Sequence, residues 1–375
     1  MATPVNSAPV FTLDSAHKPA VAVDGHPSPL DLDVQEFASY DVVIDARSPR
    51  EYSEDHVPVA LNLPVVNSEQ YEQVGILYKA DRHQAYMRGV ADSLRNMARA
   101  LDEELAALPA HARILVYCFR GGKRSRLWAE NLRTIGFKVD VLSGGWKRYR
   151  RWVIQSLTDL PSRLRYRVLA GPTGSGKTRL LKALDAVGAQ VLDLESIANH
   201  RGSLIGAVPG LAQPSQKYFD SLLLERMRSF DTQRPVWVEA ESKKIGAVQL
   251  PEALFAALNQ ATACYQIEAP MGERVRLWSE DFSHFVTTPT DMTDRLQHLI
   301  PLIGKEEFGR WQAMAEAGDA KALFERVMVK HYDPTYARSA ARNRANIAQR
   351  PLVLIDLTEA TLLAVAERLH NEAES

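Results

Sequence analysis

The first half of the chain alternates short apolar runs with longer segments whose apolar residues recur every three or four positions. The apolar runs at 41–45, 61–64, 114–117 and 138–142 predict short strands, most of them buried. Apolar residues along one face predict a helix over 82–108, and another helix is expected at about 125–135. A glycine turn at 143–146 then leads into a last helix that is rich in Lys and Arg.

The second half repeats this alternation with clearer strands. Apolar runs predict strands at 166–170, 190–193, 235–239, 263–268 and 352–356, and a helix is expected from Lys177 onward. Strands that alternate with helices favour an α/β fold with a parallel, doubly wound sheet. We expect the tail, from about 290 to 375, to be mostly helical. The predicted division is a flexible arm at 1–30, an α/β domain at 31–158 and a second α/β domain with a helical tail at 159–375.

Composition narrows the class of protein. The chain has 375 residues, of which 46% are hydrophobic and 24% charged, as in ordinary globular proteins. Its apolar runs are shorter than the roughly 20 residues that cross a bilayer, so we expect no membrane partner. The N-terminus has no pattern of a secretion signal. The two cysteines, Cys118 and Cys264, are too few for a disulfide framework, which favours a cytoplasmic location.

Cys118 opens the segment Cys-Phe-Arg-Gly-Gly-Lys-Arg-Ser directly after the predicted strand 114–117. The thiolate is the reactive form of cysteine, and nearby cations and inward-turned backbone N–H groups lower its pKa. We therefore expect Cys118 to be a catalytic thiol in an anion-binding loop. The loop residues are Arg120, Gly121, Gly122, Lys123, Arg124 and Ser125. Cys264 lies in an apolar segment and is expected to be a small buried side chain.

A second anion-binding loop follows the predicted strand 166–170. The segment 171–178 reads Gly-Pro-Thr-Gly-Ser-Gly-Lys-Thr, which fits the phosphate-binding P-loop pattern. Its expected diphosphate-binding residues are Gly171, Gly174, Ser175, Gly176, Lys177 and Thr178. Backbone N–H groups and the helix N-terminus would surround phosphate oxygens, while Thr178 offers an oxygen to Mg²⁺. The acidic partner of the metal ion or of the substrate could be Asp193, Glu239 or Glu241. Each of them is equally expected to be an acid that faces solvent at the end of a strand.

Positive charge is concentrated around these two loops. Residues 111–180 contain sixteen Lys and Arg against three acids, although the whole chain has a formal net charge of −1. This asymmetry predicts a polyanionic partner. The predicted basic belt consists of Lys147, Arg148, Arg150 and Arg151. The aromatic residues Trp128, Trp146, Tyr149 and Trp152 lie in the same region, and they are candidates for stacking on a base, although we expect at least two of them in the core.

Several segments of the first domain resemble rhodanese domains. The resemblance covers Asp45 to Tyr52, His56 to Pro64 and the Gly-Gly-Trp turn at 144–146, between which the family places a sulfur-carrying cysteine. Asp55 stands where the family usually has Gly, and we expect it on a surface turn. Cys118 and Arg124 are six positions apart, whereas many rhodaneses have five. The longer loop suits a larger anion, and its spacing is also that of cysteine-dependent phosphatases.

The whole arrangement resembles bacterial tRNA 2-selenouridine synthases. Further matching segments include 193–195, 200–203, 213–216, 239–246 and 332–336, and they add Arg201 as a candidate substrate residue. The resemblance implies conversion of wobble 2-thiouridine in the tRNA anticodon loop to 2-selenouridine. It implies S-geranylation with geranyl diphosphate, then selenation from selenophosphate through a selenopersulfide on Cys118. The implied partners are tRNA, held by the basic belt, and an enzyme that supplies selenophosphate. An ATP-dependent tRNA sulfurtransferase or kinase remains an alternative, as does a phosphatase.

Overall fold

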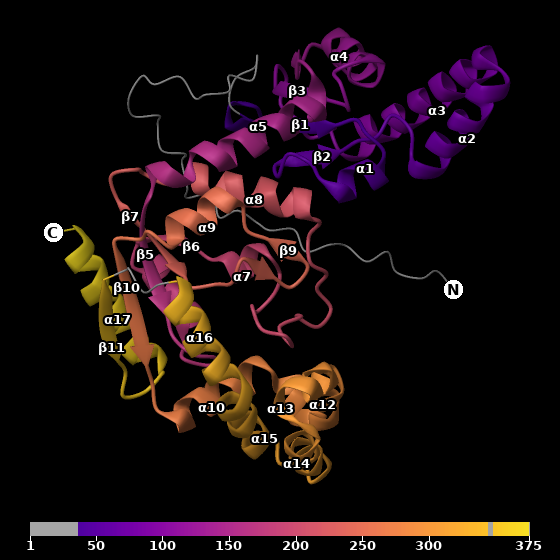
Figure 1. The fold of residues 1–375 in the computed structure, drawn as a ribbon. Coiled ribbons are helices and arrows are strands. Elements are labelled where there is room, and N and C mark those ends of the chain that lie inside the picture. The colour runs from indigo at the N-terminus through magenta and orange to yellow at the C-terminus, as the bar shows by residue number, and fades with distance from the viewer. Residues whose placement is uncertain (1–36, 344–347, 375) are drawn as a thin grey trace.

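The structure is a computed structural model that describes residues 37–343 and 348–374 (Figure 1). The predicted arm at 1–30 lies outside the described residues. The described residues form two α/β domains, each built on a parallel sheet, and one long helix, α5 (Gly145–Asp159), joins them. None of the helices in the described ranges combines the length and the apolar character needed to cross a membrane.

Within residues 37–160, four strands form a parallel sheet in the order β2-β1-β3-β4. The strands are β1 (Val42–Asp45), β2 (Ala60–Asn62), β3 (Arg113–Tyr117) and β4 (Lys138–Val141). The helices of this domain are α1 (Pro49–Glu54), α2 (Ser68–Ala80), α3 (Arg82–Glu103), α4 (Lys123–Ile135) and α5. The central strands are apolar because both faces of a parallel sheet are covered. This confirms the α/β class predicted for the first domain.

The segment between β2 and β3 is a helical hairpin, which differs from the single helix predicted at 82–108. Helix α2 lacks any buried residue in the described structure, so its sequence has no apolar stripe from which it could be predicted. Its ends are set by polar caps instead: Asn67 accepts from the N–H of Gln70, and Asp81 begins α3 by accepting from the N–H groups of His83 and Gln84. Helix α3 ends at Glu103, five residues earlier than predicted.

In the described part of residues 161–374, five strands form a parallel sheet in the order β11-β10-β5-β7-β6. They are β5 (Arg165–Ala170), β6 (Gln190–Leu192), β7 (Pro235–Glu239), β10 (Ala263–Glu268) and β11 (Gln349–Val353). Strand β11 begins and ends three residues earlier than the predicted strand at 352–356. Its pairing with β10 runs from Gln349 to Val353, and Ile355 is 81% exposed, so the end of the apolar run has left the sheet.

Helices cover both faces of this sheet, which confirms the doubly wound class. Helices α6 (Lys177–Ala186) and α17 (Glu359–Glu374) pack on one face, with Leu181 and Leu369 in the same core as Trp237. Helices α5, α8 (Gln216–Arg228) and α9 (Glu252–Leu258) pack on the other face. The short helix α7 (Leu194–Ile197) follows β6, and an antiparallel pair that was not predicted, β8 (Lys244–Ile245) and β9 (Val248–Gln249), follows β7.

The predicted helical tail, from about 290, is confirmed, and the helical region with its own core already begins at Met271. The helices of this region are α10 (Met271–Asp281), α11 (Ser283–Thr287), α12 (Pro289–Leu296), α13 (Ile300–Ile303), α14 (Lys305–Glu316), α15 (Ala320–Val327) and α16 (Asp333–Asn343). Trp278, Trp311 and Phe324 are buried at its centre. Short 3-10 segments lie at Phe37–Ser39, Pro161–Arg163 and Gln297–Leu299, and a π-helical turn at Met328–Tyr332 precedes α16.

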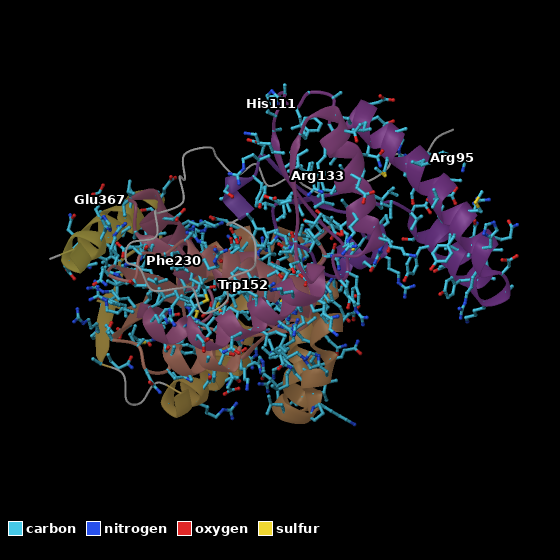
Figure 2. All side chains as sticks on the ribbon, turned by 90° about the horizontal axis from the view of Figure 1, so that it is seen from above. Arg95, His111, Arg133, Trp152, Phe230 and Glu367 are labelled. Carbon is cyan, nitrogen blue, oxygen red and sulfur yellow. The ribbon has the colours of Figure 1, made fainter. Side chains whose placement is uncertain are left out.

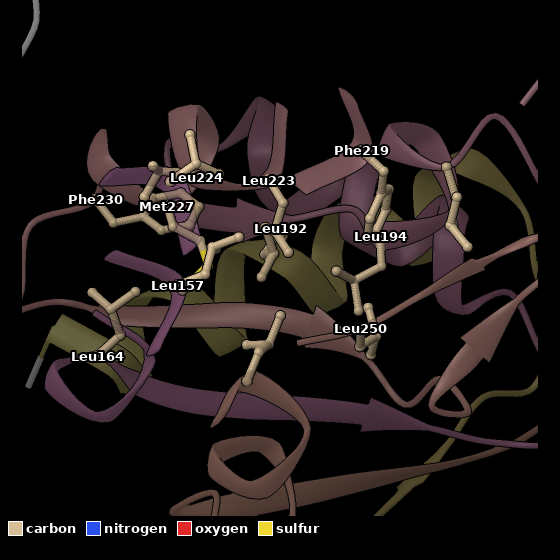
Figure 3. Close-up of a cluster of buried hydrophobic side chains, with 14 of the residues drawn as sticks. Leu157, Leu164, Leu192, Leu194, Phe219, Leu223, Leu224, Met227, Phe230 and Leu250 are labelled. Carbon is tan, nitrogen blue, oxygen red and sulfur yellow. The ribbon is translucent and has the colours of Figure 1, made fainter. Parts of the chain in front are cut away.

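The two domains share one apolar core. Helix α5 lies between them, with Tyr149, Trp152 and Val153 packed in the same cluster as residues of α8 and of the P-loop sheet. Figure 3 shows Leu157 of α5 beside Leu224, Met227 and Phe230 around α8. Because apolar side chains from both domains exclude water together, the first domain is held firmly against the second. Figure 2 places Arg95 of α3 and Glu367 of α17 at opposite sides of this assembly.

Candidate active site

Strand β3 delivers Cys118 to its loop, as predicted. The side chain is 3% exposed, and its sulfur lies 3.2 Å from the backbone nitrogen of Gly122 and 3.2 Å from Oγ of Ser125. Burial raises the pKa of the thiol, but hydrogen bonds from the Ser125 hydroxyl and from backbone N–H groups outweigh it, so the pKa of Cys118 is lowered. The loop therefore favours the thiolate, through dipoles more than through the cations that the sequence suggested.

The Gly-Gly-Trp turn is part of the same structure. Trp146 donates its backbone N–H to the carbonyl of Cys118 at 2.8 Å, and Lys147 donates to that of Phe119 at 3.0 Å. Gly145 has φ +54°, and a Cβ there would lie 2.1 Å from the Cys118 carbonyl oxygen. Only glycine permits this close approach, which explains why a turn distant in sequence supports the cysteine loop.

Arg124 has a partner that the sequence analysis missed. Its guanidinium donates to both carboxylate oxygens of Glu51, at 2.6 Å and 3.2 Å. Burial opposes the charge of Glu51, but the Arg124 bonds prevail and lower the pKa of Glu51. Glu51 also closes a capping box with Ser48 at the start of α1. The residue lies inside the rhodanese-like segment, but nothing in that segment indicates a pairing across 73 positions.

The other two cations of the loop point outward. Arg120 is exposed, with its guanidinium over the ring of Phe119 at 5.7 Å. Lys123 is exposed at the start of α4, and its ammonium lies 4.3 Å from the ring centre of Tyr86 in α3. Arg120 and Gly121 also line a basic depression of about 510 Å³, together with Arg126. The loop therefore presents positive charge around a thiol that is itself enclosed.

The P-loop follows β5 and precedes α6, as predicted. Gly174 and Gly176 have φ +75° and +86°, in the left-handed region that favours glycine. A Cβ at Gly174 would lie 2.8 Å from the carbonyl oxygen of Arg274 in α10. Arg274 is buried and donates to the carbonyl of Thr173, while it pairs with Asp333 at 2.6 Å. The loop conformation is thus fixed by the helical region as well as by its own glycines.

Two P-loop side chains, those of Lys177 and Ser175, line the pocket. Lys177 donates to the loop carbonyls of Gly171, at 2.9 Å, and Pro172. Ser175 is fully buried, and its Oγ has no hydrogen-bond partner among the described residues. A buried hydroxyl of this kind fits a phosphate oxygen better than it fits an apolar core. The two side chains, together with the backbone N–H groups of the loop, supply the donors that a diphosphate would require.

Glu195 of α7 is a site residue that the sequence analysis did not select. It accepts from Oγ1 of Thr178 at 2.9 Å. Burial, and then the negative charge of Glu241, raises the pKa of Glu195 to about 8. A Cβ built on Gly202 would lie 2.7 Å from oxygens of both Glu195 and Glu241. The two carboxyl groups therefore lie close together beside Thr178, with Gly202 between them.

The other two candidate acids, Glu239 and Asp193, do not contact Thr178 in the described structure. Glu239 is fully buried and accepts from the N–H of Glu195 at 2.9 Å, and burial raises its pKa well above the usual value. Asp193 caps α7 by accepting from the N–H of Ser196. Glu239 is thus a buried orienting group, and Asp193 has a helix-capping contact.

The donor set near Thr178 fits Mg²⁺. The described residues contain no cluster of three or more His, Cys, Asp or Glu side chains placed as a metal cage. Mg²⁺, however, is usually held by one or two carboxylates together with substrate phosphates. The Thr178 hydroxyl with Glu195 and Glu241 supplies such oxygens beside the phosphate loop. These three residues would hold the ion, which would neutralise charge on a bound diphosphate.

The pocket around the phosphate loop is lined by both charged and apolar residues. It has a volume of about 830 Å³, and its basic lining residues are Lys177, Arg179, Lys182, Arg201 and Lys244. The other lining residues include Leu204, Leu277, Trp278, Phe282 and Tyr332. Arg201 donates to the Asp281 carbonyl, and its guanidinium is 5.0 Å from the ring centre of Phe282. Because its lining is both cationic and apolar, the pocket suits an anion that carries an apolar group.

Asp55 is not on a surface turn, so that prediction was wrong. It is fully buried between the domains, where its carboxylate accepts from Nε1 of Trp146 at 2.8 Å and from Oγ of Ser221 at 2.7 Å. Beside it, the ring of His56 stacks on Tyr218 of α8 at 4.1 Å. Asp55 therefore joins the turn that supports the cysteine loop to a helix of the P-loop domain.

The basic belt on α5 divides into two groups. Lys147 and Arg151 are exposed, whereas Arg150 pairs with Asp220 of α8 and donates to the carbonyl of Lys217. Arg148 is half-buried, with its aliphatic part against Gly144. Arg150 thus has a contact between the domains, and the predicted role of the belt in binding tRNA rests chiefly on Lys147 and Arg151.

The candidates for base stacking are all in the interior. Trp128, Trp146, Tyr149 and Trp152 are 0%, 9%, 2% and 5% exposed. Nε1 of Trp128 donates to the carbonyl of Leu63, and the ring of Trp146 stacks on Phe119. The expectation that at least two are core residues is confirmed, while the idea that any of them stacks on a base is wrong. Aromatic residues close to Lys and Arg in the sequence can lie on a buried face of a helix as well as on an exposed one, so their presence alone did not predict a binding surface.

Comparisons with known proteins agree with both halves of this arrangement. Residues 33–151 match the rhodanese-like domain, and residues 164–298 match the tRNA 2-selenouridine synthase AAA domain. The chain is 30% identical over 354 residues to the tRNA 2-selenouridine synthase of Aeromonas salmonicida, covering 86% of this chain and 94% of the relative.

Two further relatives have the same description. The tRNA 2-selenouridine synthase of Nitrosomonas europaea is 34% identical over 264 residues, covering 69% of this chain and 67% of the relative. That of Cupriavidus necator is 30% identical over 346 residues, covering 84% and 92%. The thiol loop, the P-loop and their order along the chain agree with these matches. The chain therefore belongs to the tRNA 2-selenouridine synthase family and is a tRNA-modifying transferase.

Proposed function

We propose that this enzyme converts wobble 2-thiouridine of tRNA to 2-selenouridine in two steps that use its two anion loops. The observation that carries the proposal is the pairing, in one chain, of a thiol with a lowered pKa and a P-loop pocket lined by both cations and apolar side chains. The pocket suits geranyl diphosphate, and the thiol suits selenium from selenophosphate. Selenophosphate must come from an enzyme that makes it, so a supply enzyme is the expected partner.

The first step is alkylation of the sulfur. The sulfur on C2 of the thiouridine attacks C1 of geranyl diphosphate, the C–O bond breaks, and the diphosphate leaves with the bonding electrons. The base loses its N3 proton, which restores neutrality. Lys177 and the backbone N–H groups of the P-loop stabilise the charge that develops on the leaving group. Leu204, which is 53% exposed, lines the same pocket and offers apolar surface to the prenyl chain.

The second step exchanges sulfur for selenium. The Cys118 thiolate attacks selenium of selenophosphate, an S–Se bond forms, and phosphorus keeps the electron pair of the broken P–Se bond and leaves as phosphite. The terminal selenium then attacks C2 and displaces geranylthiolate. Two equivalents of a cellular thiol reduce the S–Se bond, which returns Cys118 to the thiolate and leaves selenium on the base. A lowered thiol pKa and a basic loop suit attack on a trianion.

A single experiment separates the two steps. Wild type, Cys118→Ala and Lys177→Ala are incubated with 2-thiouridine tRNA, geranyl diphosphate, selenophosphate and a thiol, and the tRNA nucleosides are measured by mass spectrometry. We expect Cys118→Ala to accumulate geranylated nucleoside without selenouridine. Loss of one preorganised contact to a leaving anion costs roughly 3–4 kcal/mol, so Lys177→Ala should lose geranylation by orders of magnitude. Supplying geranylated tRNA should restore selenation in that variant.

The fate of phosphorus tests the selenopersulfide directly. Phosphorus-31 NMR of the wild-type reaction should show phosphite in proportion to 2-selenouridine. Phosphate in its place would mean that selenium reaches the base without an S–Se bond on Cys118, which contradicts the carrier. Cys264→Ala is the matched control, because Cys264 is buried in β10, away from the cysteine loop, and should leave both products unchanged.

ATP is the remaining alternative for the P-loop. A kinase or an ATP-dependent sulfurtransferase would be stabilised by ATP and would need it for product. Thermal unfolding with geranyl diphosphate, and separately with ATP, distinguishes the cases, because a ligand that binds the native state raises the unfolding temperature. We expect the larger shift with geranyl diphosphate. A shift with ATP alone would contradict the prenyl assignment.

A further inference from the structure

The α2–α3 hairpin has an exposed aromatic surface that the two-step scheme does not use. Tyr71, Tyr78 and Tyr86 are 51%, 43% and 48% exposed, and among the described residues no other Phe, Trp or Tyr is exposed to this extent. We call these three residues the tyrosine surface. Tyr71 and Tyr78 are seven positions apart on α2 and so share a face, and the ring of Tyr86 meets Tyr78 edge-on at 6.0 Å. Exposed rings gathered in this way mark a binding surface.

Each ring of the tyrosine surface has a cation against it. The guanidinium of Arg82 is 5.4 Å from the ring centre of Tyr78, and that of Arg124 is 5.8 Å from Tyr71. The ammonium of Lys123 is 4.3 Å from Tyr86, and its hydrogen bond and charge lower the pKa of that phenol. The centre of a protein–protein interface is usually depleted of charge, whereas alternating rings and cations are typical of sites for single-stranded nucleic acid.

The tyrosine surface also adjoins the reactive thiol. Lys123 and Arg124 belong to the same loop as Gly122 and Ser125, which contact the Cys118 sulfur. The hairpin extends from the first domain beside this loop, away from the P-loop sheet (Figure 1). A molecule that lies on the three rings would therefore lie next to the loop that holds Cys118.

We propose that the tyrosine surface holds unpaired bases of the tRNA anticodon loop by stacking, which presents the wobble base to Cys118. The inference rests on the proposed function, because it takes tRNA as the substrate of the thiol. An enzyme that acts on a base must take it out of its stack, and aromatic side chains replace the lost stacking partners. The cations between the rings meet the phosphates that join those bases.

The test uses an anticodon stem–loop RNA in which one loop base beside the wobble position is 2-aminopurine, a base whose fluorescence is quenched when it stacks. The protein is the full chain. In one variant the three tyrosines are replaced together by Leu, and in the matched control they are replaced by Phe. We expect quenching with wild type and with the Phe variant. The Leu variant should bind on the order of 10- to 100-fold more weakly.

Salt dependence separates stacking from charge. Stacking releases no counterions, so the slope of log affinity against log salt should be the same for the Leu variant and wild type. Unchanged affinity and quenching in the Leu variant would overturn the proposal, and so would a Phe variant as weak as the Leu variant, because the hydroxyl groups would then matter more than the rings. A thermal melt of each variant checks that the fold is intact.

The outcome is distinguishable from failure of the proposed function. If wild type binds the stem–loop but makes no 2-selenouridine, the proposed function fails and the stacking result still stands. A different result would show that the surface binds the selenium-supplying enzyme. In that case the Leu variant would bind RNA normally and make product from free selenophosphate, but it would lose product when the supplying enzyme must deliver the selenium. The stacking proposal would then be wrong.

Discussion

At the residue scale, the Cys118 sulfur depends on dipoles arranged by its neighbours. Two partners lie at 3.2 Å from it, the N–H of Gly122 and the hydroxyl of Ser125, and these bonds offset the cost of burying a thiolate. Arg124, the obvious cation in the sequence, is paired with Glu51. The reactivity of the thiol is therefore set by short hydrogen bonds, which are less sensitive to salt than exposed charges are.

Ser125→Ala tests this explanation. Removing the hydroxyl removes a hydrogen bond that favours the thiolate over the thiol, so the Cys118 pKa should rise. The measurement is thiolate absorbance at 240 nm against pH in a Cys264→Ala background. The matched control is Lys123→Gln, which removes an exposed charge of the same loop and should move the pKa less. A larger shift in the control would show that cations dominate.

At the element scale, α5 has two surfaces with different uses. Its apolar face and Arg150 hold the two domains together, while Lys147 and Arg151 are exposed. The helix begins at the turn that supports the cysteine loop and leads to β5, which precedes the P-loop. One helix thus connects both anion loops, and its two exposed cations, Lys147 and Arg151, are available to contact tRNA phosphates.

The double variant Lys147→Gln/Arg151→Gln should weaken tRNA binding. Each lost phosphate contact reduces counterion release by about one, so the slope of log affinity against log salt should become shallower by about 2. The measurement is tRNA affinity from low to physiological salt. Lys305→Gln/Lys321→Gln, two exposed lysines of the helical tail, is the control and should leave the slope unchanged. Equal slopes for wild type, the α5 variant and the control would show that tRNA does not bind along α5.

At the scale of the whole molecule, we expect the two domains to unfold together, because they share buried contacts. Residues of both domains share a continuous apolar core, and Asp55 is buried where they meet. Burial raises the pKa of Asp55 from its ordinary 3.8 to about 6, even though Ser221 and Trp146 donate hydrogen bonds to it. The unfolded chain therefore releases the Asp55 proton at a lower pH than the native protein does.

This predicts a pH dependence of stability. Between about pH 4 and pH 6 the native state binds more protons than the unfolded state, so the contribution of Asp55 to the free energy of unfolding falls as pH rises. Asp55→Asn removes that contribution, and its stability relative to wild type should improve across this window by on the order of 2 kcal/mol. Urea unfolding at several pH values measures it. A constant difference, or separate transitions for the two domains, would contradict the account.

Much of the architecture could be predicted from the sequence. Apolar runs gave the strands of both sheets, because a buried strand must be apolar on both faces, and the glycine spacing at 171–178 gave the P-loop because few backbones can surround a phosphate. Cys118 was found because it stands at a strand end beside Gly-Gly and cations. Helix α2 was missed, since it has no buried face, and β11 was placed late because an apolar run does not report its pairing register.

What the sequence by itself determined was therefore local: strands, loops with special backbone geometry, and the identity of the reactive groups. Only the tertiary structure decided which groups face each other across long separations. Glu51 pairs with Arg124 73 positions away, Ser221 donates to Asp55 166 positions away, and Glu195 meets Thr178. It also decided that the tryptophans near the basic belt are buried while the hairpin tyrosines are open. Such partnerships depend on how elements pack, and packing is set by the whole chain at once, so a window of sequence does not contain it.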